Sequence, residues 1–168
     1  MAGPMDFGLE LLASDEGVEG VILLSYGMEQ GLGEFYKTVA SAVTESEPKK
    51  LLKHLAGIEE RHMKRLFDLY RSLAPEAISR EEMASKVSAD MVEGGHPLEK
   101  FIEEHKPLLQ NVSDILSLAM MIEAQALDLY LRYSERVEQS SARKIFYGLA
   151  EEEKAHLASL GEMMEKAI

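Results

Sequence analysis

The chain has 168 residues, of which 46% are hydrophobic and none is cysteine, and its formal net charge at pH 7 is −12. This size fits one domain with a substantial core, and the acidic charge argues against nucleic acid or an anionic membrane as a partner. Without cysteine, disulfides, thiolate catalysis and iron–sulfur clusters are excluded, so a bound metal would have nitrogen and oxygen ligands.

The first 14 residues form an extension or linker, followed by one domain at residues 15–168. The extension lacks a basic segment followed by a long apolar one, and no apolar run reaches about 18 residues. We therefore expect a soluble, cytoplasmic protein.

Two helices are predicted in the first half of the domain. The first covers about residues 15–45, with Ser14 as its N-cap, and the second covers about residues 47–74, between Ser46 and Pro75. The connection between them is so short that they should form an antiparallel hairpin.

A different pattern follows at residues 75–112, where proline and glycine separate short helical pieces such as "SREEMASKV" and "PLEKFIEEHK". A helix of about 28 residues is about 40 Å long, so a segment of this length suits a crossover between the two ends of a bundle. Two further helices are predicted at about residues 113–138 and from residue 140 or 141 to the C-terminus. Strand signals are absent, and the predicted fold class is all-α.

Each of the four long helices carries an apolar stripe at spacings of three and four residues, and polar residues interrupt each stripe at its middle. These interruptions are, in chain order, Glu29, Glu59, His62, Glu123, Glu153 and His156. A glutamate and a histidine three residues apart share one helix face, so each Glu-x-x-His motif directs both side chains to a common point.

The second hairpin repeats the first with an offset of 94 residues, which predicts pseudo-twofold symmetry. In this repeat Glu29, Tyr36, Leu55, Ala56, Glu59, His62 and Leu66 recur as Glu123, Tyr130, Leu149, Ala150, Glu153, His156 and Leu160.

The six interrupting residues should lie at one depth, because antiparallel helices meet at equal distances from their shared turn. Four carboxylates in an apolar core cannot all stay ionised without compensation. Two divalent cations would balance them, as in di-iron and di-manganese carboxylate bundles, and nitrogen and oxygen ligands suit iron or manganese. A hydrogen-bonded Glu/His layer without metal is the alternative that stays open.

Tyr36 and Tyr130 each follow a single glutamate by seven residues on the same face. We expect their hydroxyls to hydrogen-bond ligand carboxylates, and the alternative is that they are aromatic residues of the core. The remaining polar residues that we expect to be solvated rather than ligating are Glu34, His54, His96, His105 and Asp128.

The helices resemble those of rubrerythrin-type proteins in the ferritin-like superfamily. "GMEQGLGEFYKTVA" and "MIEAQALDLYLRY" are similar to the glutamate helices of that family, and "HLAGIEERHMKRL" and "GLAEEEKAHLASL" to its two Glu-x-x-His helices. The resemblance spans about residues 15–168. It implies an up-down-down-up four-helix bundle with a long helical crossover between its second and third helices.

The resemblance also implies a centre of two iron ions, for which manganese or zinc can substitute. Glu59 and Glu153 would bridge the ions, Glu29 with His62 would complete one position, and Glu123 with His156 the other. These six residues would act in catalysis through the metals, with Tyr36 and Tyr130 behind them.

Two departures from the family pattern concern the reaction. The chain has no rubredoxin domain, which carries four cysteines in peroxidase rubrerythrins, and Ala126 stands where those proteins have a further glutamate. The remaining six-ligand set is similar to the bacterioferritin ferroxidase centre. The opening "MAGPMDFGLELL" resembles the junction that follows a rhodanese domain in rhodanese–rubrerythrin fusions.

The function implied is a di-iron oxidoreductase that reduces hydrogen peroxide or dioxygen with electrons from a separate donor, such as a rubredoxin-type protein. We expect a homodimer. One alternative is a ferroxidase or iron-handling protein of ferritin type. Another is a metal-binding module that works with a rhodanese-type sulfurtransferase.

Overall fold

The computed structural model describes residues 17–73, 78–87 and 98–167. All regular elements in these ranges are helical, and no helix among them is long and apolar enough to span a membrane. The elements are α2 (Gly17–Ala42), α3 (Ser46–Leu73), α4 (Arg80–Lys86), α5 (Leu98–His105), the 3-10 helix η2 (Leu108–Gln110), α6 (Val112–Arg136) and α7 (Ser140–Ala167).

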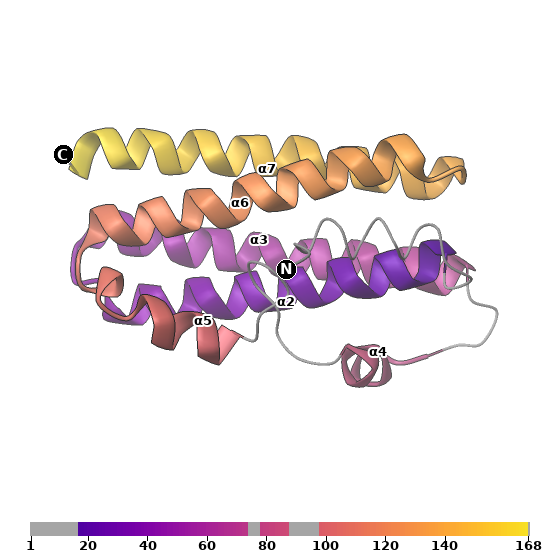
Figure 1. The fold of residues 1–168 in the computed structure, drawn as a ribbon, viewed down its shortest axis with the longest axis horizontal. Helices are drawn as coiled ribbons and strands as arrows, with labels where there is room; N and C mark the ends of the chain where they lie inside the picture. Colours follow the sequence, from indigo (N-terminus) through magenta and orange to yellow (C-terminus); the bar gives the residue numbers. More distant parts are fainter. Residues whose placement is uncertain (1–16, 74–77, 88–97, 168) are drawn as a thin grey trace.

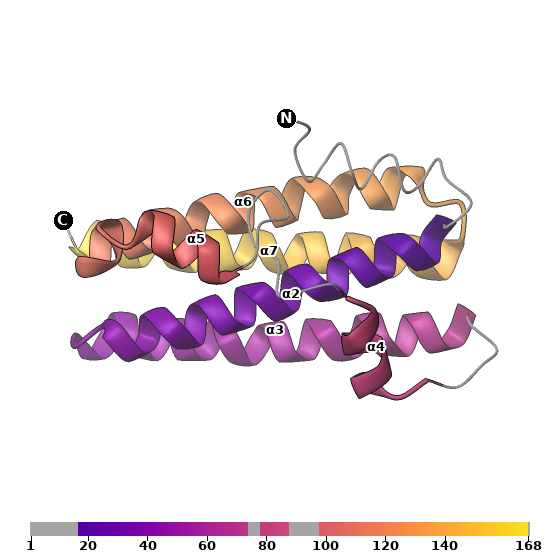
Figure 2. The same ribbon diagram turned by 60° about the horizontal axis from the view of Figure 1, so that its bottom comes forward.

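The four long helices form two antiparallel hairpins, α2 with α3 and α6 with α7 (Figure 1). The crossover, which carries α4 and α5, returns the chain to the other end of the bundle, so α3 and α6 run in the same direction. Figure 2 shows the two hairpins lying side by side, with α3 packed on α7 and α2 on α6. The bundle is therefore the ferritin-like, up-down-down-up arrangement that the sequence predicts.

The helix boundaries follow the local sequence. The hydroxyl of Ser79 caps α4 by accepting from the backbone N–H of Glu82, whose carboxylate accepts from the Ser79 N–H in return. Asn111 is the N-cap of α6, and its side-chain oxygen accepts from the backbone N–H of Asp114. At its C-terminus α2 ends at Ala42, three residues before the predicted end, because the chain reverses over residues 43–45 to enter α3. The predicted N-cap Ser14 lies outside the described residues.

The core consists of two apolar clusters separated by the polar layer. One cluster contains Leu32 to Ala40 of α2, Val43 just beyond it, and the facing parts of α3 and α6. The other contains Val21 to Tyr26 with the opposite halves of α3 and α6 and the first half of α7. Glu29 lies between them on α2, and both of its neighbours along the stripe, Ser25 and Leu32, are buried. Each long helix thus carries its polar residues into the middle of the bundle.

The crossover packs on the outside of the first hairpin through a few buried side chains. The Phe101 ring of α5 is 2% exposed and lies 6.0 Å from the Phe35 ring, centroid to centroid. Met83 of α4 is fully buried, and Arg80 pairs with Glu60 of α3 at 2.7 Å. The crossover therefore covers the side of the bundle and contributes none of the six polar side chains in the middle.

Candidate metal centre

The six polar residues of the predicted stripes converge in the interior of the bundle, each from one of the four long helices, and all are buried. Their carboxylate and imidazole atoms form two overlapping groups, and within each group the atoms lie within 4.8 Å of one another. The first group is Glu29, Glu59, His62 and Glu153, and the second is Glu59, Glu123 and His156. The common depth predicted from the hairpin geometry is therefore present.

Both imidazoles direct Nδ1 into the cluster. Nδ1 of His62 lies 3.2 Å from Glu29 Oε2, 3.1 Å from Glu59 Oε2 and 3.3 Å from Glu153 Oε1. Nδ1 of His156 lies 2.9 Å from the other oxygen of Glu153, 3.2 Å from Glu123 Oε1 and 3.6 Å from Glu59 Oε1.

Two of the carboxylates are shared between the halves. Glu59 and Glu153 approach both imidazoles, whereas Glu29 approaches only His62 and Glu123 only His156. The imidazole rings stack with their centroids 5.6 Å apart and their planes 13° from parallel. The contacts thus separate two carboxylates that approach both imidazoles from two that each approach one.

Many polar atoms of the cluster have no hydrogen bond among the described residues. They include both oxygens of Glu59 and of Glu153, one oxygen of Glu123 and Nδ1 of His156. These atoms are close to one another yet are not aligned as donors and acceptors, and burying them in this way costs free energy. Two divalent cations would accept all of these lone pairs, so the donor set fits such a pair.

The charges of the cluster conflict in the absence of a cation. Burial raises the pKa of Glu59 and of Glu123 well above the usual range, and neighbouring carboxylates add to the effect. Burial would also raise the pKa of Glu153, but its close contacts with Glu123, His156 and His62 outweigh burial and lower the pKa. Burial disfavours protonation of His156, yet its contacts with Glu123 and Glu153 raise its pKa to about 9. The cluster therefore retains protons that bound cations would displace.

Two tyrosines hold carboxylates from across the bundle. The hydroxyl of Tyr36 on α2 donates to Glu123 Oε1, and that of Tyr130 on α6 donates to Glu29 Oε1. Burial, together with the nearby carboxylates, raises the pKa of both phenols well above the usual range, so both remain neutral donors. The expected hydrogen bonds are present, and each joins one hairpin to the other, which the sequence pattern did not indicate.

A residue that the sequence analysis missed is Glu152. Its Oε2 lies 3.0 Å from Nε2 of His62, and its Oε1 accepts from the Arg65 guanidinium. Burial would raise the pKa of Glu152, but the hydrogen bond from His62 and the charges of His62 and Arg65 outweigh it and lower the pKa. The stripe analysis passed over it because a residue next to Glu153 points about 100° away around the helix.

The residues expected to be solvated fall into three groups. His54 is exposed, and Glu34 and Asp128 are partly exposed and pair with Lys37 and Arg132. His105 differs from the prediction: it is half-buried, its ring stacks on Phe101 at 4.2 Å, and its Nδ1 lies 2.9 Å from the Phe101 carbonyl. His105 is thus a packing residue of α5. His96 lies outside the described residues.

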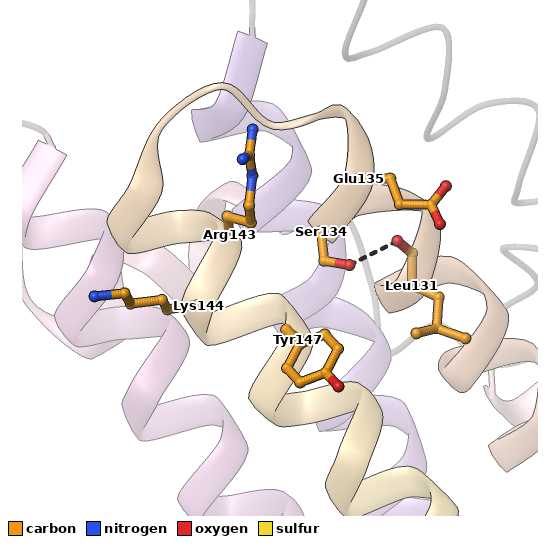
Figure 3. A pocket seen from close by; sticks show the side chains of 6 residues that line it. All are labelled: Leu131, Ser134, Glu135, Arg143, Lys144 and Tyr147. Atoms are coloured by element: carbon orange, nitrogen blue, oxygen red, sulfur yellow. Dashed lines mark hydrogen bonds between the residues drawn. The ribbon is translucent and has the colours of Figure 1, made fainter.

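A surface hollow of about 590 Å³ lies beside the connection between α6 and α7 (Figure 3). Its lining includes Tyr147, Leu131 and Ser134, whose hydroxyl donates to the Leu131 carbonyl at 2.7 Å. The guanidinium of Arg143 at its rim donates to the Val137 carbonyl at 3.0 and 3.2 Å. None of the six converging residues lines this hollow, so it is separate from the candidate centre.

Comparison with known proteins supports the fold of the chain and relates its second hairpin to one family. The family model Rubrerythrin matches residues 114–167, which is the second hairpin, and a search of curated proteins found no match. A solved structure, "Hypothetical Protein Pfu-1136390-001 From Pyrococcus furiosus", is 24% identical with a TM-score of 0.68, covering 94% of this chain and 93% of that one. At this identity the likeness shows the fold alone. The second hairpin is thus similar to the Rubrerythrin family, and the whole chain shares the all-α bundle fold of this solved structure.

Proposed function

We propose that this protein is a di-iron carboxylate oxidoreductase that reduces hydrogen peroxide or dioxygen with electrons from an external donor. The observation that carries the proposal is the buried cluster of four glutamates and two histidines, in which most carboxylate oxygens have no hydrogen bond among the described residues. Such a set is costly unless cations bind to it.

The contacts suggest how each residue would serve. Glu59 and Glu153, which approach both imidazoles, would bridge the two positions. Glu29 with His62 would complete one metal position, and Glu123 with His156 would complete the other. When bound, iron would supply the electrons and the Lewis acidity for reduction of an O–O bond.

The rest of the site would keep these ligands in place. The apolar clusters on both sides of the polar layer exclude bulk water, which strengthens electrostatic interactions within the site. Tyr36 and Tyr130 fix the orientation of Glu123 and Glu29 and remain neutral donors. With no cysteine in the chain, electrons would come from a separate protein, for which a rubredoxin-type donor is our proposal.

The test is anaerobic loading of the metal-free protein with Fe(II), followed by iron analysis and by peroxide consumption with a reductant present. We expect two irons per chain, and loss of iron and of turnover in the double variant His62→Ala with His156→Ala. His54→Ala is the matched control, because His54 is exposed on the same helix as His62. Absence of iron uptake, or full uptake by the double variant, would overturn the proposal.

A second candidate is a ferroxidase, and the observation that favours it is Ala126. This residue is buried at 2% exposure where peroxidase rubrerythrins have a further glutamate, which leaves six ligands. If iron oxidation is the function, aerobic Fe(II) should be stored as mineral in a large cage, whereas the leading proposal expects a homodimer. Sedimentation after aeration distinguishes the two.

Partnership with a rhodanese-type protein rests on residues 1–12, which lie outside the described residues. This partnership and the cytoplasmic location are both proposals. Co-purification of the chain with a neighbouring sulfurtransferase would support the partnership, and independent migration of the two proteins would contradict it.

A further inference from the structure

The two halves of the candidate centre differ behind their histidines. Nε2 of His62 has a carboxylate partner in Glu152 at 3.0 Å, and this carboxylate is held in turn by Arg65, which lies on α3 one turn beyond His62. The side chains of Glu152 and Arg65 are 41% and 33% exposed, so the chain of contacts runs from the buried centre toward the surface.

The repeat-related histidine, His156, lacks such an arrangement in the part of the chain that the structure describes. The position equivalent to Glu152 in the other half is Ile58, which is buried at 8% exposure. Among the described residues, Nε2 of His156 has no hydrogen-bond partner, although its Nδ1 approaches three carboxylates. Within the described ranges, the contacts at Nδ1 are thus repeated in both halves, while the contacts at Nε2 occur only in the first.

A missing side chain makes room for this arrangement. A Cβ atom built on Gly148 would lie 2.7 Å from Nη2 of Arg65, so the guanidinium occupies the space beside this glycine. The repeat equivalent of Gly148 is His54, and that of Arg65 is Ser159. All three positions of the contact therefore differ between the halves, and the two hairpins have diverged here while keeping the ligand residues.

We propose that Glu152, held by Arg65, is a positioning residue for His62 that makes the metal position at His62 bind a divalent cation more tightly than the position at His156. The two positions would then fill in order. This inference rests on the proposed function, since it concerns the same cluster.

The physical reason is the tautomer of the imidazole. With Glu152 accepting a hydrogen bond, the proton of neutral His62 resides on Nε2, which leaves the Nδ1 lone pair directed at Glu29, Glu59 and Glu153. A carboxylate behind a ligating histidine also makes it a stronger ligand, and losing such a partner typically weakens metal affinity 10–100-fold. For His156, none of the residues that the structure describes accepts from Nε2 and selects the tautomer in this way.

A second observation agrees with unequal positions. Four residues offer ligand atoms within 4.8 Å of one another around His62, whereas three do so around His156. Glu153 also approaches Nδ1 of His156 at 2.9 Å, so the two positions differ in how closely the ligand atoms gather and not in the number of carboxylates.

The test is a calorimetric titration of the metal-free protein with Co(II). We expect two Co(II) per chain in two steps, the first at least about tenfold tighter. Glu152→Gln should weaken the affinity of the tight step about 10–100-fold and merge the two steps. Arg65→Gln should also weaken that affinity, by a smaller factor. The control is Glu151→Gln, which removes the same charge from an exposed neighbour paired with Lys154 and should leave both steps unchanged.

The repeat offers a gain-of-function variant. Ile58→Glu places a carboxylate behind His156 and should tighten the weak step, and Ile58→Gln serves if the glutamate prevents folding. The melting temperature of the metal-free variants shows whether Glu152 positions His62 or only stabilises the fold. A purely structural role would shift that temperature without changing the ratio of the two metal affinities.

The outcomes distinguish this inference from the proposed function. No Co(II) or Fe(II) binding by the unaltered protein would overturn both. Two equal steps, or equal effects of Glu152→Gln and Glu151→Gln, would overturn the inference alone and leave the metal centre standing. Loss of the tight step in His62→Ala but not in His156→Ala is the result that assigns it to His62.

Discussion

The hydroxyl of Tyr130 on α6 donates a hydrogen bond to Oε1 of Glu29 on α2, so the second hairpin holds a glutamate of the first. Tyr36 and Glu123 form the reciprocal contact. Because both acceptors lie in the buried cluster, these two bonds fix the relative depth of the hairpins as well as the orientation of two carboxylates. They tie assembly of the bundle to assembly of the site.

Replacing either tyrosine by phenylalanine should therefore destabilise the metal-free protein. Tyr130→Phe leaves a buried oxygen of Glu29 without its donor, and such a loss typically costs about 1–3 kcal/mol. Urea unfolding followed by circular dichroism gives the change in the free energy of unfolding. Tyr36→Phe should behave alike because the repeat makes the two contacts equivalent.

Tyr133 is the matched control for these variants. Its side chain is also fully buried, but within the described part of the chain its hydroxyl has no hydrogen-bond partner. Tyr133→Phe should leave the free energy of unfolding unchanged or raise it by up to about 1 kcal/mol. Equal losses for Tyr133→Phe and Tyr130→Phe would show that the aromatic volume matters and the hydrogen bond does not.

The metal-free protein should lose stability as pH rises from 6.5 to 9. The pKa of His156 is 6.5 in the reference state and about 9 in the folded protein, because contacts with Glu123 and Glu153 outweigh burial. A group whose pKa is higher in the folded than in the unfolded protein stabilises the fold fully below its unfolded-state pKa. This stabilisation is lost as the pH rises through its folded-state pKa. Burial also raises the pKa values of Glu59 and Glu123, so their contribution to stability likewise falls as the pH rises.

Urea unfolding at pH 6.5 and pH 9 measures this loss, which should be on the order of 1–3 kcal/mol. Saturating Mn(II) should reduce the loss, since cations take the place of the retained protons. A metal-free protein that is as stable at pH 9 as at pH 6.5 would contradict the charge arrangement derived for the cluster.

Two helical glycines should tolerate alanine with a gain in stability. A Cβ on Gly57 or on Gly161 meets nothing within 4 Å, so each substitution should raise the free energy of unfolding by about 0.5–1 kcal/mol through helix propensity. Gly148→Ala should gain less, because its Cβ would lie 2.7 Å from Arg65 Nη2 and the guanidinium must move. Thermal denaturation of the three variants checks the order.

Truncation of Phe101 should release the crossover from the first hairpin. This ring is 2% exposed between Phe35 and His105, and removing a buried aromatic side chain typically costs about 3–5 kcal/mol. We expect Phe101→Ala to speed proteolysis within α5 while metal stoichiometry stays unchanged, since α5 supplies none of the six converging residues. Loss of metal together with faster cleavage would show that the crossover supports the site directly.

Much of the fold could be predicted because helical periodicity is a local property. The stripes, the short connections and the long proline-containing segment predicted two hairpins and a crossover, and the six polar residues of the stripes are buried as expected. Boundaries were less accurate: α2 ends at Ala42 and α6 at Arg136, because the turn geometry decides where each helix stops. His105 was assigned to solvent, although Phe101, on which its ring stacks, precedes it by four residues on α5, and this spacing could have indicated the contact.

By itself, the sequence determined which residues share a helix face and at what depth they meet, since the 3.6-residue period and the equal distances from each turn depend on spacing alone. It thereby predicted that four glutamates and two histidines converge. Only the tertiary structure decided the partners across the bundle, namely Tyr130 with Glu29, Tyr36 with Glu123, and Glu152 with His62 and Arg65. These contacts depend on how one hairpin packs against the other, and residues that meet this way have no fixed spacing along the chain.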